Sequence, residues 1–124
     1  MEEKKIRILV VDDEEKIRSA LSQWFDLRGF LVDEAVDGVQ AVEKCSDAVF
    51  DVITMDLEMP RLNGFGAISK IREINPKVPI LALTGYTRLS EEAMNSGANA
   101  VLMKPIPLRD LERKVLDLVE QNVR

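Results

Sequence analysis

The sequence of 124 residues contains no histidine and only one cysteine, Cys45. Without histidine, the chain lacks the commonest zinc ligand and the commonest general base of proteins, and it has no histidine from which to donate a phosphoryl group. A single cysteine excludes an internal disulfide. Cys45 falls within a helical pattern, so we expect a small core residue rather than a reactive thiol.

The chain also lacks an excess of basic residues and any long apolar run. It has 17 Lys and Arg against 22 Asp and Glu, which gives a formal net charge of −5. A nucleic-acid partner would require clustered Lys and Arg, so we expect none. No apolar run approaches the roughly 20 residues that span a bilayer, and the run after the charged N-terminus is too short for a signal peptide. We therefore expect a cytoplasmic protein without a membrane partner.

Short apolar runs alternate with amphipathic segments along the chain. The short runs predict five strands, at residues 6–11, 31–35, 50–55, 80–84 and 100–103. Apolar residues at helical spacing predict five helices, at about residues 17–25, 38–45, 64–75, 91–96 and 108–119. Gly29 and Gly97 are natural helix ends, and Asp37 is a plausible N-cap.

This alternation predicts one α/β domain over residues 1–124, a doubly wound parallel sheet with helices on both faces. The strands at 6–11, 50–55 and 80–84 are almost continuously apolar, which indicates burial on both sides. In an open sheet of this kind, ligands bind at the carboxyl ends of the strands.

Charged and polar residues stand at the carboxyl ends of four predicted strands. They are Asp12, Asp13 and Glu14 after the first strand, Asp56 after the third, Thr84 at the end of the fourth and Lys104 after the fifth. Neighbouring carboxylates repel one another, and oxygen ligands suit Mg²⁺, which keeps waters and pairs with substrate phosphate. The cluster therefore predicts a Mg²⁺ site that becomes complete with a phosphoryl group.

An aspartate at such a site can be a nucleophile, because it can form an acyl phosphate. Asp56 is the candidate. Lys104 would offset negative charge as phosphorus moves between oxygens, and Thr84 would donate a hydrogen bond to a phosphoryl oxygen.

Each motif also has a simpler interpretation when taken alone. Acids at Asp12 and Asp13 favour the N-terminus of the following helix. Lys104 alone would more often be solvated, and Thr84 alone would more often bond to backbone. We interpret Asn63-Gly64 mostly as a turn signal. The coincidence of so many motifs at one edge of the sheet favours a functional site.

The motifs, taken in order, are Val10-Val11-Asp12-Asp13-Glu14, Asp56-Leu57-Glu58-Met59-Pro60 with Asn63-Gly64, Thr84-Gly85 and Lys104-Pro105. Together they resemble the receiver domains of response regulators in two-component signalling systems, over nearly the whole chain. The resemblance implies a flavodoxin-like sheet of strand order 2-1-3-4-5 in a phosphorylation-activated switch that is not a conventional enzyme.

The resemblance also implies the metal and phosphoryl ligands. Asp56 matches the phosphoacceptor, modified in a Mg²⁺-dependent reaction by a sensor histidine kinase or a histidine phosphotransfer protein. Asp13 matches a direct Mg²⁺ ligand, and Asp12 matches a carboxylate that often acts through a metal-bound water. The backbone carbonyl of Glu58 matches a third protein ligand.

The switching residues match only in part. Thr84 matches the switch hydroxyl, and Lys104 matches the lysine that contacts the phosphoryl group, with a typically cis bond to Pro105. Receivers commonly carry an aromatic residue at the position of Val101, which is small and stiff here. We therefore expect activation to depend more on movement of the loop at residues 84–89.

Two positions that flank the phosphoryl site in this family, occupied here by Glu58 and Tyr86, influence how fast water reaches it. We expect the bulk of Tyr86 to slow loss of the phosphoryl group. The resemblance places the output surface on the fourth helix, fifth strand and fifth helix, with candidate contacts at Leu89, Met94, Val101 and Ile106.

The partner at that surface is a downstream protein target or a fused output domain. The chain is equally consistent with a separate protein and with the receiver of a longer regulator or hybrid kinase. Residues 98–100, Ala-Asn-Ala, lack the acids that support dimers of winged-helix regulators, which makes that dimer less favoured.

Three other classes share parts of the pattern. An aspartyl phosphatase or mutase usually carries two aspartates separated by one residue, whereas Asp12 and Asp13 are adjacent. A flavin-binding electron carrier would need a phosphate loop after the first strand, where an acidic loop would repel the phosphate. A receiver-like module used only for interaction would not need these site residues.

Overall fold

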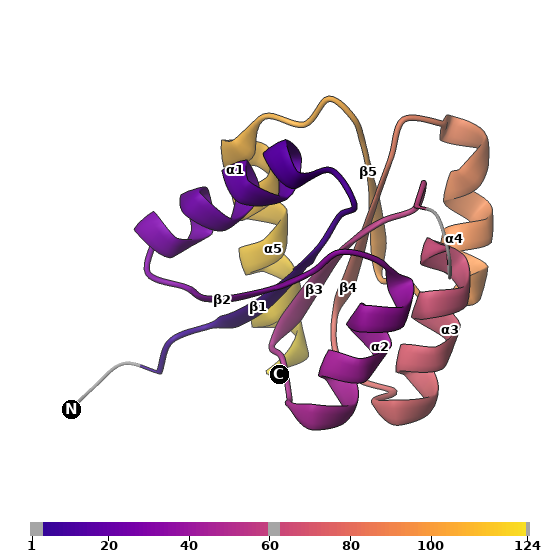
Figure 1. The fold of residues 1–124 in the computed structure, drawn as a ribbon, viewed down its shortest axis with the longest axis horizontal. Coiled ribbons are helices and arrows are strands. Elements are labelled where there is room, and N and C mark those ends of the chain that lie inside the picture. The colour runs from indigo at the N-terminus through magenta and orange to yellow at the C-terminus, as the bar shows by residue number, and fades with distance from the viewer. Residues whose placement is uncertain (1–3, 60–62, 124) are drawn as a thin grey trace.

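The computed structural model describes residues 4–59 and 63–123, and over that part of the chain five strands alternate with five α-helices (Figure 1). The strands are β1 (Arg7–Val11), β2 (Leu31–Ala35), β3 (Val52–Asp56), β4 (Ile80–Thr84) and β5 (Ala100–Met103). The helices are α1 (Glu15–Leu27), α2 (Gly38–Asp47), α3 (Gly64–Ile74), α4 (Ser90–Ser96) and α5 (Leu108–Asn122). The predicted alternation is confirmed.

The strands form one parallel sheet in the order β2-β1-β3-β4-β5, as the resemblance implied. Every residue of β3 and β4 is buried, and so are the last four residues of β1. The chain leaves β1 toward β2 on one side and returns to β3 on the other, so β1 is the point where the strand order reverses. Val11 pairs with Met55, which brings the carboxyl ends of β1 and β3 together.

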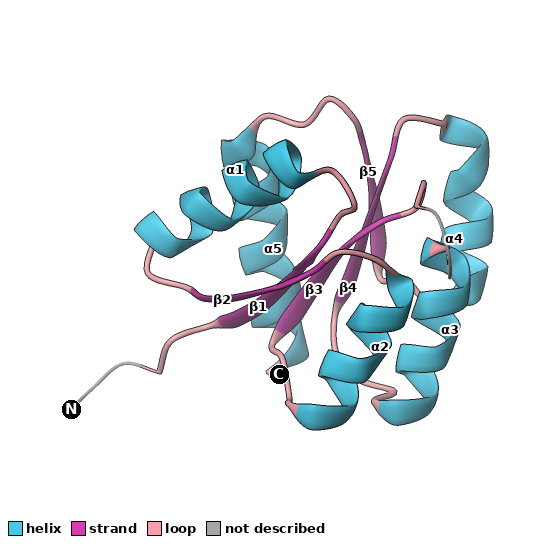
Figure 2. Ribbon diagram, viewed as in Figure 1, coloured by secondary structure: helices cyan, strands magenta, loops and turns pink. Residues whose placement is uncertain are grey.

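Helices cover both faces of the sheet (Figure 2). On one face, α1 and α5 pack through Phe25, Leu111 and Val115 against the inward side chains of β1 and β4. On the other face, α2, α3 and α4 pack through Ala41, Ile68 and Ala93. These two apolar layers hold the strand ends in fixed register.

Local signals place the helix ends largely as predicted. The Asp37 side chain accepts a hydrogen bond from Gln40 N at 2.8 Å and caps α2. Gly29, just past α1, has φ +92°, a conformation that side chains rarely adopt. The structure adds a short 3₁₀ turn, η1 (Thr87–Leu89), that periodicity did not predict, and β3 begins at Val52 rather than at residue 50.

Asn63 and Gly64 do more than mark a turn, so our interpretation of that pair was wrong. The Asn63 side chain accepts from Gly66 N at 2.9 Å and caps α3. A Cβ added to Gly64 would lie 2.7 Å from the carbonyl oxygen of Asp56 and 2.7 Å from Leu57 Cα. Gly64 therefore lets α3 begin directly against the end of β3. Pro60, which belongs to the same motif, lies outside the described residues.

Cys45 and Arg72 are both structural. Cys45 is partly buried against the core, and burial raises the pKa of its thiol to about 11, so it is protonated at neutral pH.

The Arg72 guanidinium donates to the carbonyls of Gly97 (2.8 Å) and Val78 (2.6 Å) and to Asn99 Oδ1 (2.7 Å). It thereby ties α3 to the turns that flank β4 and β5.

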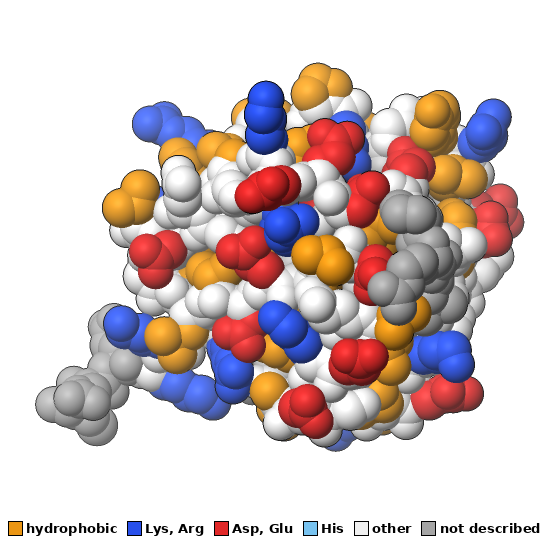
Figure 3. All heavy atoms as spheres, in the orientation of Figure 1, with side chains coloured by type: hydrophobic (Ala, Val, Ile, Leu, Met, Phe, Trp, Pro, Cys, Tyr) orange, Lys and Arg blue, Asp and Glu red, His pale blue; other side chains and the backbone are white. Residues whose placement is uncertain are grey.

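No helix within the described part of the chain is both long and apolar enough to cross a membrane. Acidic and basic side chains are interspersed over the face drawn in Figure 3.

We predict that Gly64→Ala destabilises the fold by about 1–3 kcal/mol, because the added methyl group overlaps backbone atoms that cannot move aside freely. This exceeds the gain of about 1 kcal/mol that alanine normally gives over glycine in a helix. Urea unfolding followed by circular dichroism measures the change. Gly85→Ala is the control, since its Cβ would meet only Glu58 Oε1, at 3.8 Å. Equal stability of the two variants would contradict the close approach at Gly64.

Candidate functional site

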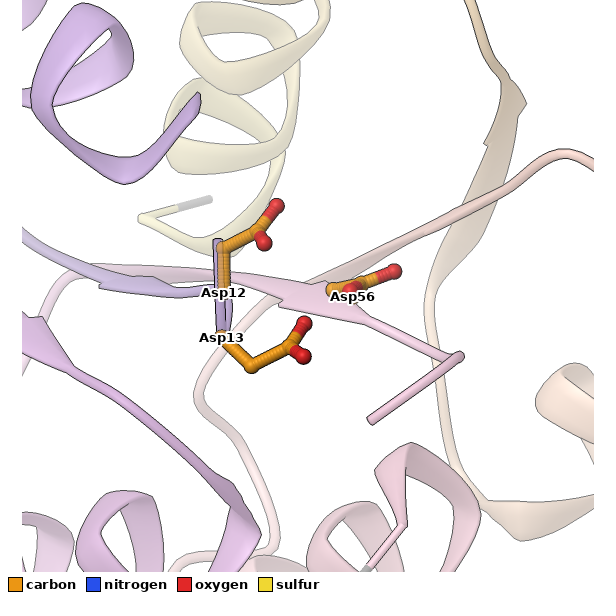
Figure 4. Close-up of side chains that lie close together, drawn as sticks. All are labelled: Asp12, Asp13 and Asp56. Atoms are coloured by element: carbon orange, nitrogen blue, oxygen red, sulfur yellow. The ribbon is translucent and has the colours of Figure 1, made fainter. Parts of the chain in front are cut away.

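Three carboxylates meet at the carboxyl edge of the sheet, from the ends of β1 and β3 (Figure 4). One carboxylate oxygen from each of Asp12, Asp13 and Asp56 lies within 4.8 Å of the other two. Asp12 and Asp56 are almost fully buried, at 1% and 2% exposure, while Asp13 is exposed. The sequence predicted this convergence from strand ends alone, and the predicted grouping of the three aspartates is present.

The buried carboxylate of Asp12 is only half satisfied. Its Oδ1 accepts a hydrogen bond from Glu14 N at 2.9 Å, whereas its buried Oδ2 has no hydrogen-bond partner among the described residues. A buried, unpaired carboxylate oxygen is costly unless a donor or a cation satisfies it. The three acids supply only oxygen ligands, which fit a hard divalent cation, directly or through a bound water.

Lys104 brings positive charge into the cluster. Its Nζ lies 2.8 Å from Asp56 Oδ1, and the same oxygen accepts a longer hydrogen bond, of 3.3 Å, from Glu58 N. The backbone holds the lysine in place, because Lys104 N donates to the Thr84 carbonyl at 2.8 Å. The Lys104–Pro105 peptide bond is cis, as the resemblance implied.

Burial and neighbouring charges shift the pKa values of these groups. Burial raises the pKa of Asp56 to about 6, and the Asp12 charge also raises it, while the Lys104 ammonium opposes both effects. Burial likewise raises the pKa of Asp12. For Lys104, burial alone would lower the pKa, but the hydrogen bond and charge of Asp56 outweigh it and raise the pKa. When the three aspartates are ionised, the single positive charge of Lys104 therefore does not balance them.

The Thr84 side chain is fully buried, and its hydroxyl both donates and accepts a hydrogen bond. Its Oγ1 donates to Glu58 Oε1 at 3.1 Å and accepts from Tyr86 N at 3.0 Å. The amide of Gly85 donates to the same Glu58 oxygen at 3.0 Å. The resemblance implied a role for the Glu58 carbonyl, but these contacts of the Glu58 side chain were not predicted from the sequence. The available signal was an acidic residue two positions after Asp56, at the edge where Thr84-Gly85 also ends a strand.

The four candidate output residues differ in exposure. Met94 on α4 is 46% exposed, whereas Leu89 and Val101 pack partly buried against the core between the sheet and α2, α3 and α4. Ile106 packs partly buried against the opposite layer. Their roles as contacts remain predictions.

The expected effect of Tyr86 on loss of the phosphoryl group also remains a prediction. The Tyr86 side chain is 51% exposed, and the Arg88 guanidinium lies 5.1 Å from the centre of its ring.

An apolar cleft of about 340 Å³ opens beside the site, between α1 and the segment that joins β5 to α5. It is lined by Asp12, Ile17, Leu21, Leu83, Lys104, Pro105, Ile106 and Leu111. The cleft gives a partner an apolar surface next to the charged residues.

A doubly wound α/β domain with an acidic cluster and a lysine at its carboxyl edge fits a signalling domain that responds to a phosphoryl group, and the comparison with protein families decides the class. The sequence model described as "Response regulator receiver domain" matches residues 8–116, and the chain belongs to this family. Phosphorylation-activated signalling is the general function of the family, which is a signalling domain rather than a conventional enzyme.

Similar proteins agree with this assignment. The chain is 38% identical over 116 residues to sensor protein EvgS of Escherichia coli O157:H7, covering 92% of this chain and 10% of that protein. The structure of chemotaxis protein CheY4 of Vibrio cholerae is similar with a TM-score of 0.88 at 32% identity, over 93% of this chain and 99% of that one.

The receiver domain of sensor histidine kinase PA1611 of Pseudomonas aeruginosa is similar with a TM-score of 0.87 at 30% identity. The similarity covers 94% of this chain and 99% of that one, and that structure has a magnesium ion coordinated in its active-site cleft. The chain spans between a tenth and about half of the length of the first curated relatives that it matches.

We predict that Asp56→Asn is more stable than the wild type at pH 7 in metal-free buffer, by about 1–3 kcal/mol. The pKa of Asp56 in the folded protein is about 6, above its ordinary value of 3.8, so its contribution to stability is complete below pH 4 and is lost as the pH rises through 6. Asparagine cannot ionise, so the stability difference should grow between pH 4 and pH 7. Urea unfolding at a series of pH values measures it, and parallel stability curves for the two proteins would contradict the prediction.

Proposed function

We propose that Asp56 accepts a phosphoryl group from the phosphohistidine of a sensor histidine kinase or a histidine phosphotransfer protein, in a Mg²⁺-dependent reaction. The single observation that carries the proposal is the buried Asp56 carboxylate, 2.8 Å from Lys104 Nζ and beside the Asp12 and Asp13 carboxylates. It combines a nucleophile, a countercharge and an oxygen-lined cation site at one strand edge.

In this proposal Asp12, Asp13, Asp56 and the backbone carbonyl of Glu58 hold Mg²⁺. The unpartnered Asp12 Oδ2 and the all-oxygen donor set support this assignment, and so does the magnesium ion in the similar PA1611 receiver. When bound, Mg²⁺ offsets the carboxylate charges and stabilises charge on the transferred phosphoryl group.

The transfer itself is a substitution at phosphorus. An Asp56 carboxylate oxygen forms the new O–P bond as the N–P bond of the donor phosphohistidine breaks, and the released imidazole takes a proton from solvent. Lys104, which is already paired with Asp56, moves its charge toward the phosphoryl oxygens as they arrive. Hydrolysis of the aspartyl phosphate by water at the same site returns Asp56 and releases phosphate, so the domain acts only on itself.

The cleft beside the site suits the phosphoryl donor. Its apolar lining between α1 and α5 lies next to Asp12 and Lys104, so a helix of the donor that packs there brings its phosphohistidine to Asp56.

In this proposal residues 1–124 act as one receiver domain. The output is a change in the surface formed by α4, β5 and α5, where Met94 is exposed and where a downstream target or a fused output domain binds.

Intact-mass spectrometry tests the function directly. We expect one added phosphoryl group on wild-type protein incubated with acetyl phosphate or phosphoramidate and Mg²⁺, and none when Mg²⁺ is chelated. Asp56→Asn should take up no phosphoryl group, because it lacks the nucleophile. Asp47→Asn is the matched control, since Asp47 is an exposed aspartate at the end of α2, and it should be modified like the wild type. A phosphoryl adduct on Asp56→Asn would show that the acceptor lies elsewhere.

A further inference from the structure

The side chain of Glu58 occupies the two hydrogen-bond donors at the end of β4. Both the Thr84 hydroxyl (3.1 Å) and the Gly85 amide (3.0 Å) donate to the same oxygen, Glu58 Oε1. A hydrogen bond to a carboxylate is stronger than one between neutral groups, and two donors on one oxygen fix its position. The donors that face the site from β4 are therefore already satisfied by an anion of the protein itself.

The Glu58 carboxylate lies at an acidic edge of the sheet and is only partly hydrogen-bonded. Glu58 follows two residues after Asp56, at the edge that also carries Asp12 and Asp13. Its second oxygen, Oε2, is buried and has no hydrogen-bond partner among the described residues. A glutamate side chain that rotated into water would avoid both the repulsion of the neighbouring acids and the burial of an unpaired oxygen. The Glu58 side chain remains at the site because the donors of Thr84 and Gly85 together bind an anion.

We propose that the Glu58 carboxylate is an internal surrogate for the phosphoryl group. It holds Thr84 and Gly85 while Asp56 is unmodified, and it is displaced when a phosphoryl group on Asp56 takes over these donors. The inference rests on the proposed function, since it concerns the same site, and it makes Glu58 a positioning residue that acts through Thr84 and Gly85.

The backbone of Glu58 links this exchange to Asp56. Glu58 N donates to Asp56 Oδ1 at 3.3 Å, while the Glu58 side chain reaches Thr84, so one residue contacts both the acceptor and the switch hydroxyl. The phosphoryl group carries a charge of about −1.5 to −2 at neutral pH, and because the acyl linkage removes the carboxylate charge of Asp56, the net charge added to the site is about −1. This added negative charge repels the nearby Glu58 carboxylate. Glu58 then moves out toward solvent, and the loop from β4 exchanges one anion for another.

This exchange has a measurable consequence. Because Glu58 competes for donors that the phosphoryl group needs, it weakens uptake of a phosphoryl analogue. Loss of one net hydrogen bond changes an equilibrium by roughly two- to tenfold. Removal of the competing side chain should therefore tighten analogue binding, and removal of only its charge should do so to a smaller extent.

The test measures binding of beryllofluoride with Mg²⁺ to the wild type, Glu58→Ala and Glu58→Gln. We expect Glu58→Ala to bind about five- to tenfold more tightly, and Glu58→Gln to lie between, since its amide oxygen still accepts from Thr84 and Gly85. Glu15→Gln is the charge-matched control, because Glu15 is exposed in the first turn of α1 and no side-chain hydrogen bond joins it to Thr84 or Gly85 within the described part of the chain. Its binding should change by no more than about twofold, the effect of one screened charge.

A second readout needs neither metal nor analogue. In the unmodified, metal-free protein, the Gly85 amide proton should move upfield in the NMR spectrum of Glu58→Ala, because it loses its acceptor. It should change little in Glu58→Gln and not at all in Glu15→Gln. Glu58→Gln also keeps the test informative if Glu58→Ala folds poorly.

The outcomes separate this inference from the function on which it rests. If the wild type takes up a phosphoryl group and Glu58→Ala binds beryllofluoride no more tightly than Glu15→Gln, the surrogate role is wrong and the function stands. An unchanged Gly85 amide in Glu58→Ala overturns the surrogate role as well. If the wild type takes up neither a phosphoryl group nor beryllofluoride, the proposed function fails and the surrogate role fails with it.

Discussion

The pairing of buried Asp56 with Lys104, 2.8 Å apart, is the interaction on which the rest of the site depends. It places one ammonium against a group of three aspartates, two of which are almost fully buried. One positive charge cannot balance them, and burial makes the remaining repulsion costly. The site is therefore incomplete as a set of protein groups, and in the proposed function a cation supplies the missing positive charge while a phosphoryl group supplies further acceptors.

The sheet topology is what allows such an unfavourable cluster to persist. Strand order reverses at β1, so the ends of β1 and β3 lie side by side and present their acids at the same edge. Apolar layers on both faces hold the strands in register, and Gly64 lets α3 begin tightly against the end of β3. The stability of the two cores offsets the cost of the site, as is common where local strain serves function.

Much of this architecture could be predicted from the sequence because its signals are local. The period of the apolar residues and the length of each segment distinguish strands from helices, and Asp37 is recognisable as a helix N-cap from its residue type and position. The acids at Asp12, Asp13 and Asp56 could be grouped because the carboxyl ends of parallel strands share one edge. The contacts of Arg72 with the turns near Val78 and Gly97, and the direction of the Glu58 side chain, could not be predicted. They depend on how separate segments meet in space, and neither rotamers nor loop paths are encoded by periodicity.

The proposed function requires the strand-end carboxylates to form a cation site before any phosphoryl group arrives. A titration of the unmodified protein with Mg²⁺, followed by the amide resonances of Asp12, Asp13 and Asp56, measures this binding. We expect saturable shifts at these three amides, with an affinity that weakens at high salt. Amides that do not respond to Mg²⁺ would contradict it, because the buried carboxylates would then persist without the cation that their arrangement is argued to require.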